Sequence, residues 1–506
     1  MALADIEKSS AAEAIGEGRL SRCSNKNEES SHETRDWTDK EEKKIKIKLD
    51  LVLLGNLMLG FFALQLDKTN ISSAIITTFV KDIGITNNIV NNGNQLLLAA
   101  IVIFEIPSNM MLAKFGAPTW LTFQCFSWGL VATFQAFINN KASFYATRFL
   151  LGLLEAGYLA GALVVIGMFY TKQEIALRMT VLYTANYVAT GTSSLIAAGM
   201  FNLDGASGLE DWQSSIQWLF LIDGIFTVFV SFSFLFLLPR APSWTRPLLN
   251  IPALDVFNDR ERDIMSRRIR LEDGTRGEEL SSFSTMEAIR YLYKNYYIWI
   301  HALVAFISLV PKGGLLLYGP TIVKNLGFDK FKANILVSVC NYALVVLALI
   351  AAWISDRVKL RGPICFICTA YALIMAGVQY SLVLKTDKWA KYAVFVLFMA
   401  GNATFQGINS AWLSSNVRDT KALCVGQALV VMGANLGGLA GQQLFRDEDA
   451  PKYTNGFLAI MCFYAATLVL VVLATGVYWN KNRKLVRTSS ADTSRESNFG
   501  EGRFQI

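Results

Sequence analysis

Apolar stretches about as long as a membrane is thick recur along the whole chain, and polar stretches separate them. A helix that crosses a bilayer needs roughly 20 mainly apolar residues. Such stretches lie near 49–67, 94–113, 118–138, 143–170, 179–202 and 217–238, and then near 297–322, 333–353, 363–384, 391–414, 422–444 and 456–479. The pattern predicts an all-α polytopic membrane protein with twelve transmembrane helices in two six-helix halves.

The polar intervals divide the chain into parts. We expect a cytosolic, disordered tail over 1–47, a six-helix bundle over 48–238, a cytosolic central loop over 239–296, a second six-helix bundle over 297–480 and a cytosolic tail over 481–506. Lysine and arginine gather in the tails and in the central loop, which is typical of segments on the cytosolic side. We therefore expect both termini in the cytosol, and the plasma membrane as the location.

Composition excludes several other classes of protein. The chain of 506 residues is 53% hydrophobic and 17% charged, and its formal net charge of +7 fits membrane orientation better than nucleic-acid binding. We find no glycine-rich phosphate loop, no zinc-ligand spacing and no Ser-His-Asp set, so we expect no enzyme activity, no ATP drive, no cofactor and no metal. Cys365 and Cys368 form a CxxC inside an apolar stretch, which we interpret as packing.

Two charged residues lie inside the fourth apolar stretch. Arg148 and Glu155 are seven residues apart, which places them on one face of an α-helix. A charge at bilayer depth costs roughly 3 kcal/mol on insertion scales, so such residues usually face a protein interior and serve a function. We expect Gly152 to leave open space between them, and Gly157 and Gly161 to form a seam for close helix packing on the opposite face. Alternatively, Arg148 snorkels to the interface and Glu155 holds a neighbouring helix.

The turn between the eighth and ninth stretches carries a recognisable motif. Asp356, Arg357 and Arg361, followed by Gly362, resemble the DRxxxR-G gate motif of the major facilitator superfamily. In that family the motif clamps the cytosolic side shut, and two similar six-helix halves surround a central cavity. We therefore expect these three charged residues to form a cytosolic gate. The corresponding first-half loop, residues 113–116, lacks the Asp-Arg pair, so the resemblance does not imply a symmetric gate.

Four further stretches resemble one branch of that superfamily, the anion:cation symporters, and within it the fungal allantoate, pantothenate and nicotinate permeases. Residues 66–71 resemble an LDRxNI signature, residues 148–157 an RxxxGxxEAG pattern, residues 212–224 a WRWLFxIEG run and residues 445–453 an FxxxDAPxYxxG stretch. The common order and spacing of the four stretches carry the resemblance, which covers residues 46–480.

The resemblance implies roles for four intramembrane charges. Asp67 and Glu155 would bind protons, while Lys68 and Arg148 would meet the substrate anion. Lys68 stands where Arg is common and Asp223 stands where Glu is common, so the charges are kept. We also expect Asp67 to lie across from Arg148 and to release it when protonated. The alternative is that Asp67 and Lys68 form a solvated pair at the outer end of the first helix.

The seventh stretch supplies a cation from the second half. Residues 311–314 read Pro-Lys-Gly-Gly, and we expect the helix to open there because proline removes a backbone hydrogen bond. Lys312 at such a break is a natural contact for an anion, although it could instead snorkel or pair with Glu155. Asn341 and Gln406 are candidate substrate-binding residues, or could join helices instead. The eleventh stretch predicts a close helix crossing through Gly433, Gly437 and Gly441.

These observations predict proton-coupled uptake of a small organic anion by alternating access. Vitamins, ureido acids, dipeptides and sulfur-containing anions are the substrate classes of similar carriers, and the sequence does not choose among them. We expect the protein to work as a monomer whose partners are the anion, the proton and the lipid bilayer. Two alternatives remain: a drug:proton antiporter of the same fold, and a nutrient sensor that signals without net transport.

Overall fold

The computed structural model describes a large part of the chain, and the statements below concern that part. The described residues are 35–75, 87–203, 212–249, 256–272, 282–382, 387–402, 404–417, 419–445, 449, 453–491 and 504–505. The chain divides into two units, residues 1–45 and residues 46–506. In the first unit, Arg35 pairs with Asp39 and Glu42, and the Trp37 indole donates to Glu42. The first 34 residues of the expected disordered tail lie outside the described residues.

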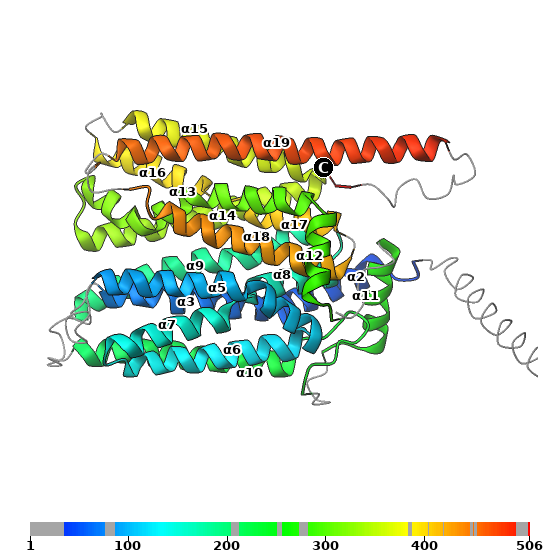
Figure 1. Ribbon diagram of the computed structural model, residues 1–506, viewed down its shortest axis with the longest axis horizontal. Helices are drawn as coiled ribbons and strands as arrows, with labels where there is room; N and C mark the ends of the chain where they lie inside the picture. The colour runs from blue at the N-terminus through cyan, green and yellow to red at the C-terminus, as the bar shows by residue number, and fades with distance from the viewer. Residues whose placement is uncertain are drawn as a thin grey trace, which may run out of the picture. The chain divides into compact units, whose positions relative to one another are not determined.

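The first half of the membrane bundle follows the predicted order of spans (Figure 1). Its elements are α2 (Asp39–Leu49), η1 (Asp50–Leu54), α3 (Gly55–Ile75), α5 (Asn87–Phe115), α6 (Ala117–Phe134), η2 (Gln135–Phe137), α7 (Lys141–Glu155), α8 (Tyr158–Phe169), α9 (Ile175–Leu203) and α10 (Trp212–Leu237). Helix α2 begins inside the tail that was predicted over 1–47, so the helical part of the chain starts earlier than expected.

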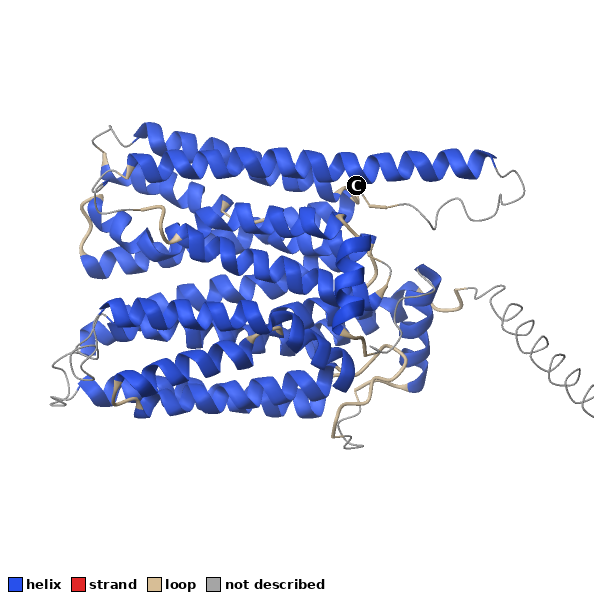
Figure 2. Ribbon diagram, in the orientation of Figure 1, coloured by secondary structure: helices blue, strands red, loops and turns tan. Residues whose placement is uncertain are grey.

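Two short helices, α11 (Asp259–Glu272) and α12 (Thr285–Lys294), occupy the central loop. The second half contains α13 (Tyr297–Asn325), α14 (Lys330–Val358), α15 (Arg361–Leu382), α16 (Lys388–Gly401), α17 (Gln406–Asn416), α18 (Thr420–Gly441) and α19 (Thr454–Ala491). Figure 2 shows helices joined by loops, and within the described ranges the extended pairing is one isolated bridge between Ala241 and Trp244. Helix α19 continues beyond residue 480, where the second bundle was expected to end.

Nine helices of the described residues are long and apolar enough to cross a membrane. Three further spans, α6, α9 and the pair α16–α17, complete the predicted twelve. Helix α9 carries many hydroxyl and amide side chains, and α16–α17 is interrupted in the middle, so neither presents a long apolar window. The fold class predicted from the sequence is therefore confirmed.

The two halves meet along several helices. Helix α9 packs against α14 and α17, and α5 and α8 pack against α18. Within the second half, α13 and α18 approach so closely that the α18 glycines face backbone carbonyls of α13. A Cβ atom on Gly433, Gly437 or Gly441 would collide with the carbonyl oxygen of Ala302, Phe306 or Val310, respectively. The predicted close crossing is thus present.

The expected break in the seventh span is absent. Helix α13 runs through Pro311 and Pro320 without interruption. Gly313 and Gly314 lie where a side chain would collide with the backbone of Gly438 and Gly441. These glycines therefore serve close packing against α18, and the backbone does not open at Lys312.

The fourth span is broken, although the sequence was interpreted as one continuous helix. Helix α7 ends at Glu155, and Gly157 adopts a left-handed φ of 82° before α8 begins. A residue with a side chain rarely adopts this conformation, which explains the glycine. Gly152 does not leave open space, because a Cβ atom there would collide with the Leu97 carbonyl oxygen of α5. The polar face of α7 is therefore packed.

Candidate functional site

The predicted site residues lie in three places. Asp67, Lys68, Arg148 and Glu155 lie inside the first half, Lys312, Asn341 and Gln406 lie on helices of the second half, and Asp356, Arg357 and Arg361 lie at one end of α14 and the start of α15. We call this last region the gate end.

Lys68 and Glu155 form an ion pair inside the first half. The Nζ of Lys68 lies 3.2 Å from the Oε2 of Glu155, and the lysine side chain is 22% exposed while the glutamate side chain is fully buried. Neither carboxylate oxygen of Glu155 has a hydrogen-bond partner among the described residues. Because a buried charge without compensation is costly, Lys68 is positioned as the counter-charge of this carboxylate.

Gln124 on α6 holds the break beside Glu155. Its Nε2 donates to the carbonyl oxygens of Ala156 at 2.7 Å and Leu154 at 3.0 Å, and lies 3.0 Å from the Oγ of Ser108. These carbonyl groups lose their intrahelical partners where α7 ends, so the amide replaces the missing hydrogen bonds. The sequence analysis missed Gln124, whose only signal is an amide inside an apolar stretch.

Arg148 is buried, yet it does not form the expected ion pair with Asp67. Its Nη2 donates to the Oε1 of Gln135 at 2.5 Å, and its guanidinium lies over the Phe144 ring at 5.6 Å. Asp67 and Glu155 lie within electrostatic reach of Arg148, but within the described ranges neither forms an ion pair with it. The guanidinium is therefore held by an amide and an aromatic ring.

Asp67 instead faces Asp223 of α10. The two carboxyl groups lie within side-chain hydrogen-bonding range, and Asp67 is 2% exposed. Two carboxyl groups can share a hydrogen bond only when one of them carries a proton. Asp67 and Asp223 therefore face each other inside the first half, near the Lys68–Glu155 pair. The sequence analysis noted Asp223 only as a departure from the usual Glu.

Lys312 reaches across to the first half. Its Nζ lies 4.5 Å from the centroid of the Tyr187 ring on α9, in a cation–π arrangement. Among the described residues Lys312 forms no ion pair. Glu155, one of its expected partners, is paired with Lys68 instead. The lysine is therefore a cation between the halves with an aromatic neighbour.

Gln406 and Asn341 have mainly structural contacts. The Nε2 of Gln406 donates to the Oγ of Ser308 on α13 at 2.6 Å, while its Oε1 has no hydrogen bond within the described part of the chain. The Nδ2 of Asn341 donates to the Val337 carbonyl oxygen of its own helix at 3.2 Å. The Nε2 of Gln406 thus joins two helices, as one of the two interpretations predicts. Its Oε1 can still accept a hydrogen bond from a ligand.

The two halves share one architectural feature, a broken helix with a polar residue at the break. Glu155 ends α7 near the middle of the span Lys141–Phe169, and Gln406 begins α17 just beyond the break that follows α16. Both side chains keep oxygens without hydrogen bonds among the described residues. Helices interrupted near the membrane midplane are typical of substrate and ion sites in transporters.

At the gate end, Asp356 and Arg361 tie the second half to the first. The Oδ1 of Asp356 lies 2.7 Å from the Nη1 of Arg361. The same carboxylate accepts from the backbone N–H of Ala176 at 3.2 Å and of Leu177 at 2.8 Å, at the start of α9. Arg361 is fully buried and its Nη2 donates to the Lys172 carbonyl oxygen at 2.6 Å. These contacts join the two halves at this end.

Arg357 does not take part in this network. Its side chain is exposed, and its guanidinium lies over the Trp353 ring at 4.9 Å. One residue along an α-helix turns the side chain by about 100°, so the neighbour of Asp356 faces away from the first half. The expectation that Arg357 belongs to the gate is therefore wrong in its geometry.

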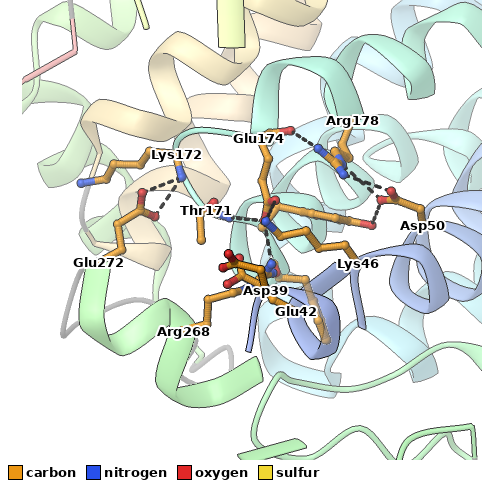
Figure 3. A network of polar contacts seen from close by, with 12 residues as sticks. Asp39, Glu42, Lys46, Asp50, Thr171, Lys172, Glu174, Arg178, Arg268 and Glu272 are labelled. Carbon is orange, nitrogen blue, oxygen red and sulfur yellow. Dashed lines mark hydrogen bonds and ion pairs between the residues drawn. The ribbon is translucent and has the colours of Figure 1, made fainter. Parts of the chain in front are cut away.

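The first half has a charge network of its own at the gate end (Figure 3). Glu174 lies 3.0 Å from the Nζ of Lys46 and 3.0 Å from the Nη1 of Arg268 on α11. Arg178 donates to both oxygens of Asp50, at 3.1 Å and 3.0 Å. The central loop is thereby fastened to the start of α9.

The carboxyl group of Glu174 has a shifted pKa. Burial raises its pKa, but the cations of Arg268, Lys46 and Arg178 outweigh this effect and hold the pKa below the usual value. The sequence analysis did not identify this network as a site. One signal was available, because Glu174 and Arg178 lie one helical turn apart at the edge of an apolar stretch.

Comparison with known proteins agrees with this architecture. A family model described as the Major Facilitator Superfamily matches residues 57–442, well over half of the chain. The chain belongs to the Major Facilitator Superfamily. It is therefore a membrane transporter and not an enzyme.

Similar proteins include transporters of fungi. The uncharacterized transporter YIL166C of Saccharomyces cerevisiae is 27% identical over 465 residues, which cover 91% of this chain and 84% of that protein. The MFS-type transporter cnsO of Penicillium expansum is 29% identical over 448 residues, covering 87% and 84%. The proton:xylose symporter XylE, solved with 6-bromo-6-deoxy-D-glucose, matches with a TM-score of 0.62 at 14% identity, covering 85% of this chain and 95% of that chain. This last match shows the fold.

Parts of the four motif stretches lie outside the described residues. Residues 446–448 and 450–452 of the last stretch are among them, as are the side chains of Trp212 and Trp218. The buried charged residues of the first three stretches, Asp67, Arg148, Glu155 and Asp223, lie inside the first half.

Proposed function

We propose that this protein is a proton-coupled carrier that takes up a small organic anion by alternating access. The proposal places it in the anion:cation symporter branch, beside the fungal allantoate, pantothenate and nicotinate permeases. It acts as a monomer in the plasma membrane. The gate end and both termini face the cytosol, because lysine and arginine gather in the tails and central loop.

The observation that carries the proposal is Lys312. Lys312 is half-buried between the halves, where an ammonium group without a counter-charge is costly, and among the described residues it lies over the face of the Tyr187 ring and forms no ion pair. An anionic substrate would supply the missing negative charge. A cationic drug would instead be repelled, which argues against the drug:proton antiporter.

Proton coupling is assigned to the first half. Glu155 is ionised beside Lys68, and protonation of the carboxylate would release the lysine. Asp67 and Asp223 provide a second place where one proton can be held between two carboxyl groups. Arg148 lies within electrostatic reach of Asp67 and Glu155, so its freedom to meet an anion depends on their charge. The solved carrier of similar fold, XylE, is by its title a proton symporter.

Alternating access needs a gate that closes and opens. The closed gate end holds Asp356 against the first amides of α9 and Arg361 against the Lys172 carbonyl oxygen. Rocking of one half against the other would break these contacts and expose the space between the broken helices to the cytosol. The substrate is then released inside, together with the proton.

Uptake assays test the proposal directly. Cells that express the protein are supplied with labelled nicotinate, pantothenate, biotin, allantoate, a dipeptide and a sulfur-containing anion, with and without a protonophore. We expect concentrative uptake of at least one of these anions, and the protonophore should abolish the accumulation. Uptake that survives the protonophore would contradict proton coupling, and export of a cationic drug would favour the antiporter. Retained signalling without accumulation would favour a sensor.

A further inference from the structure

Phe504 and Gln505 lie against the second half, where they contact α17 and α19. The Oδ1 of Asn482 accepts from the Phe504 backbone N–H at 2.8 Å, and the Nδ2 of Asn482 donates to the Phe504 carbonyl oxygen at 2.9 Å. Asn416 repeats this arrangement with Gln505, at 2.7 Å and 2.9 Å. Two asparagines thus each bind both backbone groups of one residue.

The side chains around this peptide add specific contacts. The Phe504 ring lies 5.8 Å from the Tyr478 ring, and the Nζ of Lys481 lies 5.0 Å from the Phe504 centroid. The Nε1 of Trp412 donates to the Gln505 carbonyl oxygen at 2.9 Å. We call the surface formed by Trp412, Asn416, Tyr478, Lys481 and Asn482 the tail groove.

Buried contacts hold the floor of the tail groove in place. His301 bonds to Asn409 at 2.7 Å through Nδ1 and to the hydroxyl of Tyr478 at 3.0 Å through Nε2. Its ring meets Trp412 edge to face, with centroids 5.0 Å apart. The aromatic residues of the tail groove therefore keep fixed positions, as a preformed binding site requires.

The peptide also reaches the gate. The Nε of Arg361 donates to the Oε1 of Gln505 at 3.2 Å. Its Nη1 donates to Ser355 and pairs with Asp356, and its Nη2 donates to the Lys172 carbonyl oxygen. A guanidinium is a rigid planar fork, so an acceptor on Nε determines where the two Nη groups point. Gln505 thereby directs Arg361 toward the first half.

We propose that the tail groove binds the backbone of a short peptide segment and that its ligand is Phe504–Gln505 of the same chain. Docking of this segment positions Arg361 and holds the gate end closed. Because the segment is tethered to α19, its local concentration is high and modest contacts suffice. Release of the segment frees Nε of Arg361, and the gate end opens more often. The docked segment Phe504–Gln505 therefore lowers the frequency with which the gate end opens.

Hydrogen–deuterium exchange on the purified full chain in lipid nanodiscs tests this proposal. The backbone N–H groups of Ala176 and Leu177 lie in the first turn of α9, have no intrahelical acceptor and donate to Asp356 in the closed gate. Their exchange rate therefore reports gate opening directly. No substrate is needed, so the outcome is independent of the proposed transport function.

Two variants release the segment in different ways. Asn482→Asp keeps the size of the side chain but replaces the donor to the Phe504 carbonyl with a repelling oxygen. Phe504→Ala combined with Gln505→Ala removes the ring and the acceptor for Arg361 and leaves α19 unchanged. The matched control is Asn480→Asp, the same chemical change at an exposed position of α19 with no recorded contact to the segment.

We expect both release variants to speed exchange of Ala176 and Leu177 about fivefold, the change expected when one net hydrogen bond is lost. Exchange in the control should equal that of the wild type. The proposal is overturned if residues 504–505 lose protection while the α9 amides keep their wild-type rates, since the segment would then be only an anchor. It is also overturned if neither release variant changes exchange anywhere, or if Asn480→Asp has the same effect.

Discussion

The Nζ of Lys68 on α3 lies 3.2 Å from the Oε2 of Glu155 at the end of α7. The pair joins the first span to the break of the fourth, and the lysine keeps some exposure while the glutamate has none. Removal of Lys68 therefore leaves the buried carboxylate of Glu155 without its counter-charge. Removal of the carboxylate leaves Lys68 unpaired, but water can still reach this cation. The two deletions should not be equivalent.

A double-mutant cycle measures this pair. Lys68→Met should destabilise the protein by about 3 kcal/mol, the lower end for breaking a buried pair, and Glu155→Gln should cost less. The double variant should be more stable than the sum of the two losses, because no stranded charge remains. Thermal unfolding in detergent gives the four values. The matched control is the cycle of Asp67→Asn with Arg148→Gln, which should show weaker coupling because these residues do not form an ion pair. Equal coupling energies in the two cycles would contradict the Lys68–Glu155 ion pair.

Glu155→Gln should also separate coupling from binding. The amide keeps the shape of the protonated acid but cannot give up a proton, so Lys68 stays released. We expect concentrative uptake to collapse, while exchange of internal for external substrate, which needs no net proton movement, survives in part. Labelled uptake and counterflow in proteoliposomes measure the two activities. Proton-driven accumulation at the wild-type level would remove Glu155 from the mechanism.

The sequence identified Asp67, Lys68, Arg148 and Glu155 as intramembrane charges of the first half but not their partners. Seven-residue spacing correctly placed Arg148 and Glu155 on one buried face of a helix. The Asp67–Arg148 pair was nevertheless wrong, because the partners depend on the left-handed turn at Gly157 and on the rotation of α3 against α10. A local sequence pattern shows neither this turn nor this rotation. Gln135, the partner of Arg148, lies on a short helical turn that carries no motif.

Lys312 should determine substrate affinity. Lys312→Ala should raise the KM for the anion by about tenfold to a hundredfold, the range for one hydrogen bond to a charged group, and leave the amount of protein in the membrane unchanged. Lys312→Arg should recover part of the affinity. Lys324→Ala, an exposed lysine near the end of the same helix, is the control. Normal uptake kinetics in the alanine variant would show that Lys312 only snorkels.

Glu174 should make stability depend on pH. Its pKa is held below the usual value, so its contribution is fully present above the unfolded-state pKa of about 4.3 and is lost as the pH falls through the lower folded value. The melting temperature of Glu174→Gln should therefore lie below that of the wild type at pH 7, and the difference should shrink below about pH 4. Asp263→Asn, which removes a carboxylate that is 47% exposed and pairs with Arg267, should change little at either pH. A constant difference would show that Glu174 acts through packing.

The two networks at the gate end differ in how far the sequence could predict them. Asp356 and Arg361 lie within six residues and form a local motif, so their pairing was predictable. The first-half network draws Asp50, Glu174 and Arg268 from three separate parts of the chain. Their closeness depends on how α11 packs against the start of α9, which no short motif encodes.

The crossing of α13 and α18 offers the sharpest structural test. A Cβ atom on Gly437 would collide with the Phe306 carbonyl oxygen, whereas a Cβ atom on the adjacent Gly438 meets nothing within 4 Å. Gly437→Ala should therefore force the helices apart and cost about 1–3 kcal/mol or more, as overpacking does. Gly438→Ala should be neutral or stabilise by up to about 1 kcal/mol, because alanine favours the helix. Thermal unfolding in detergent compares the two variants, and equal effects would mean that α13 and α18 do not approach at this register.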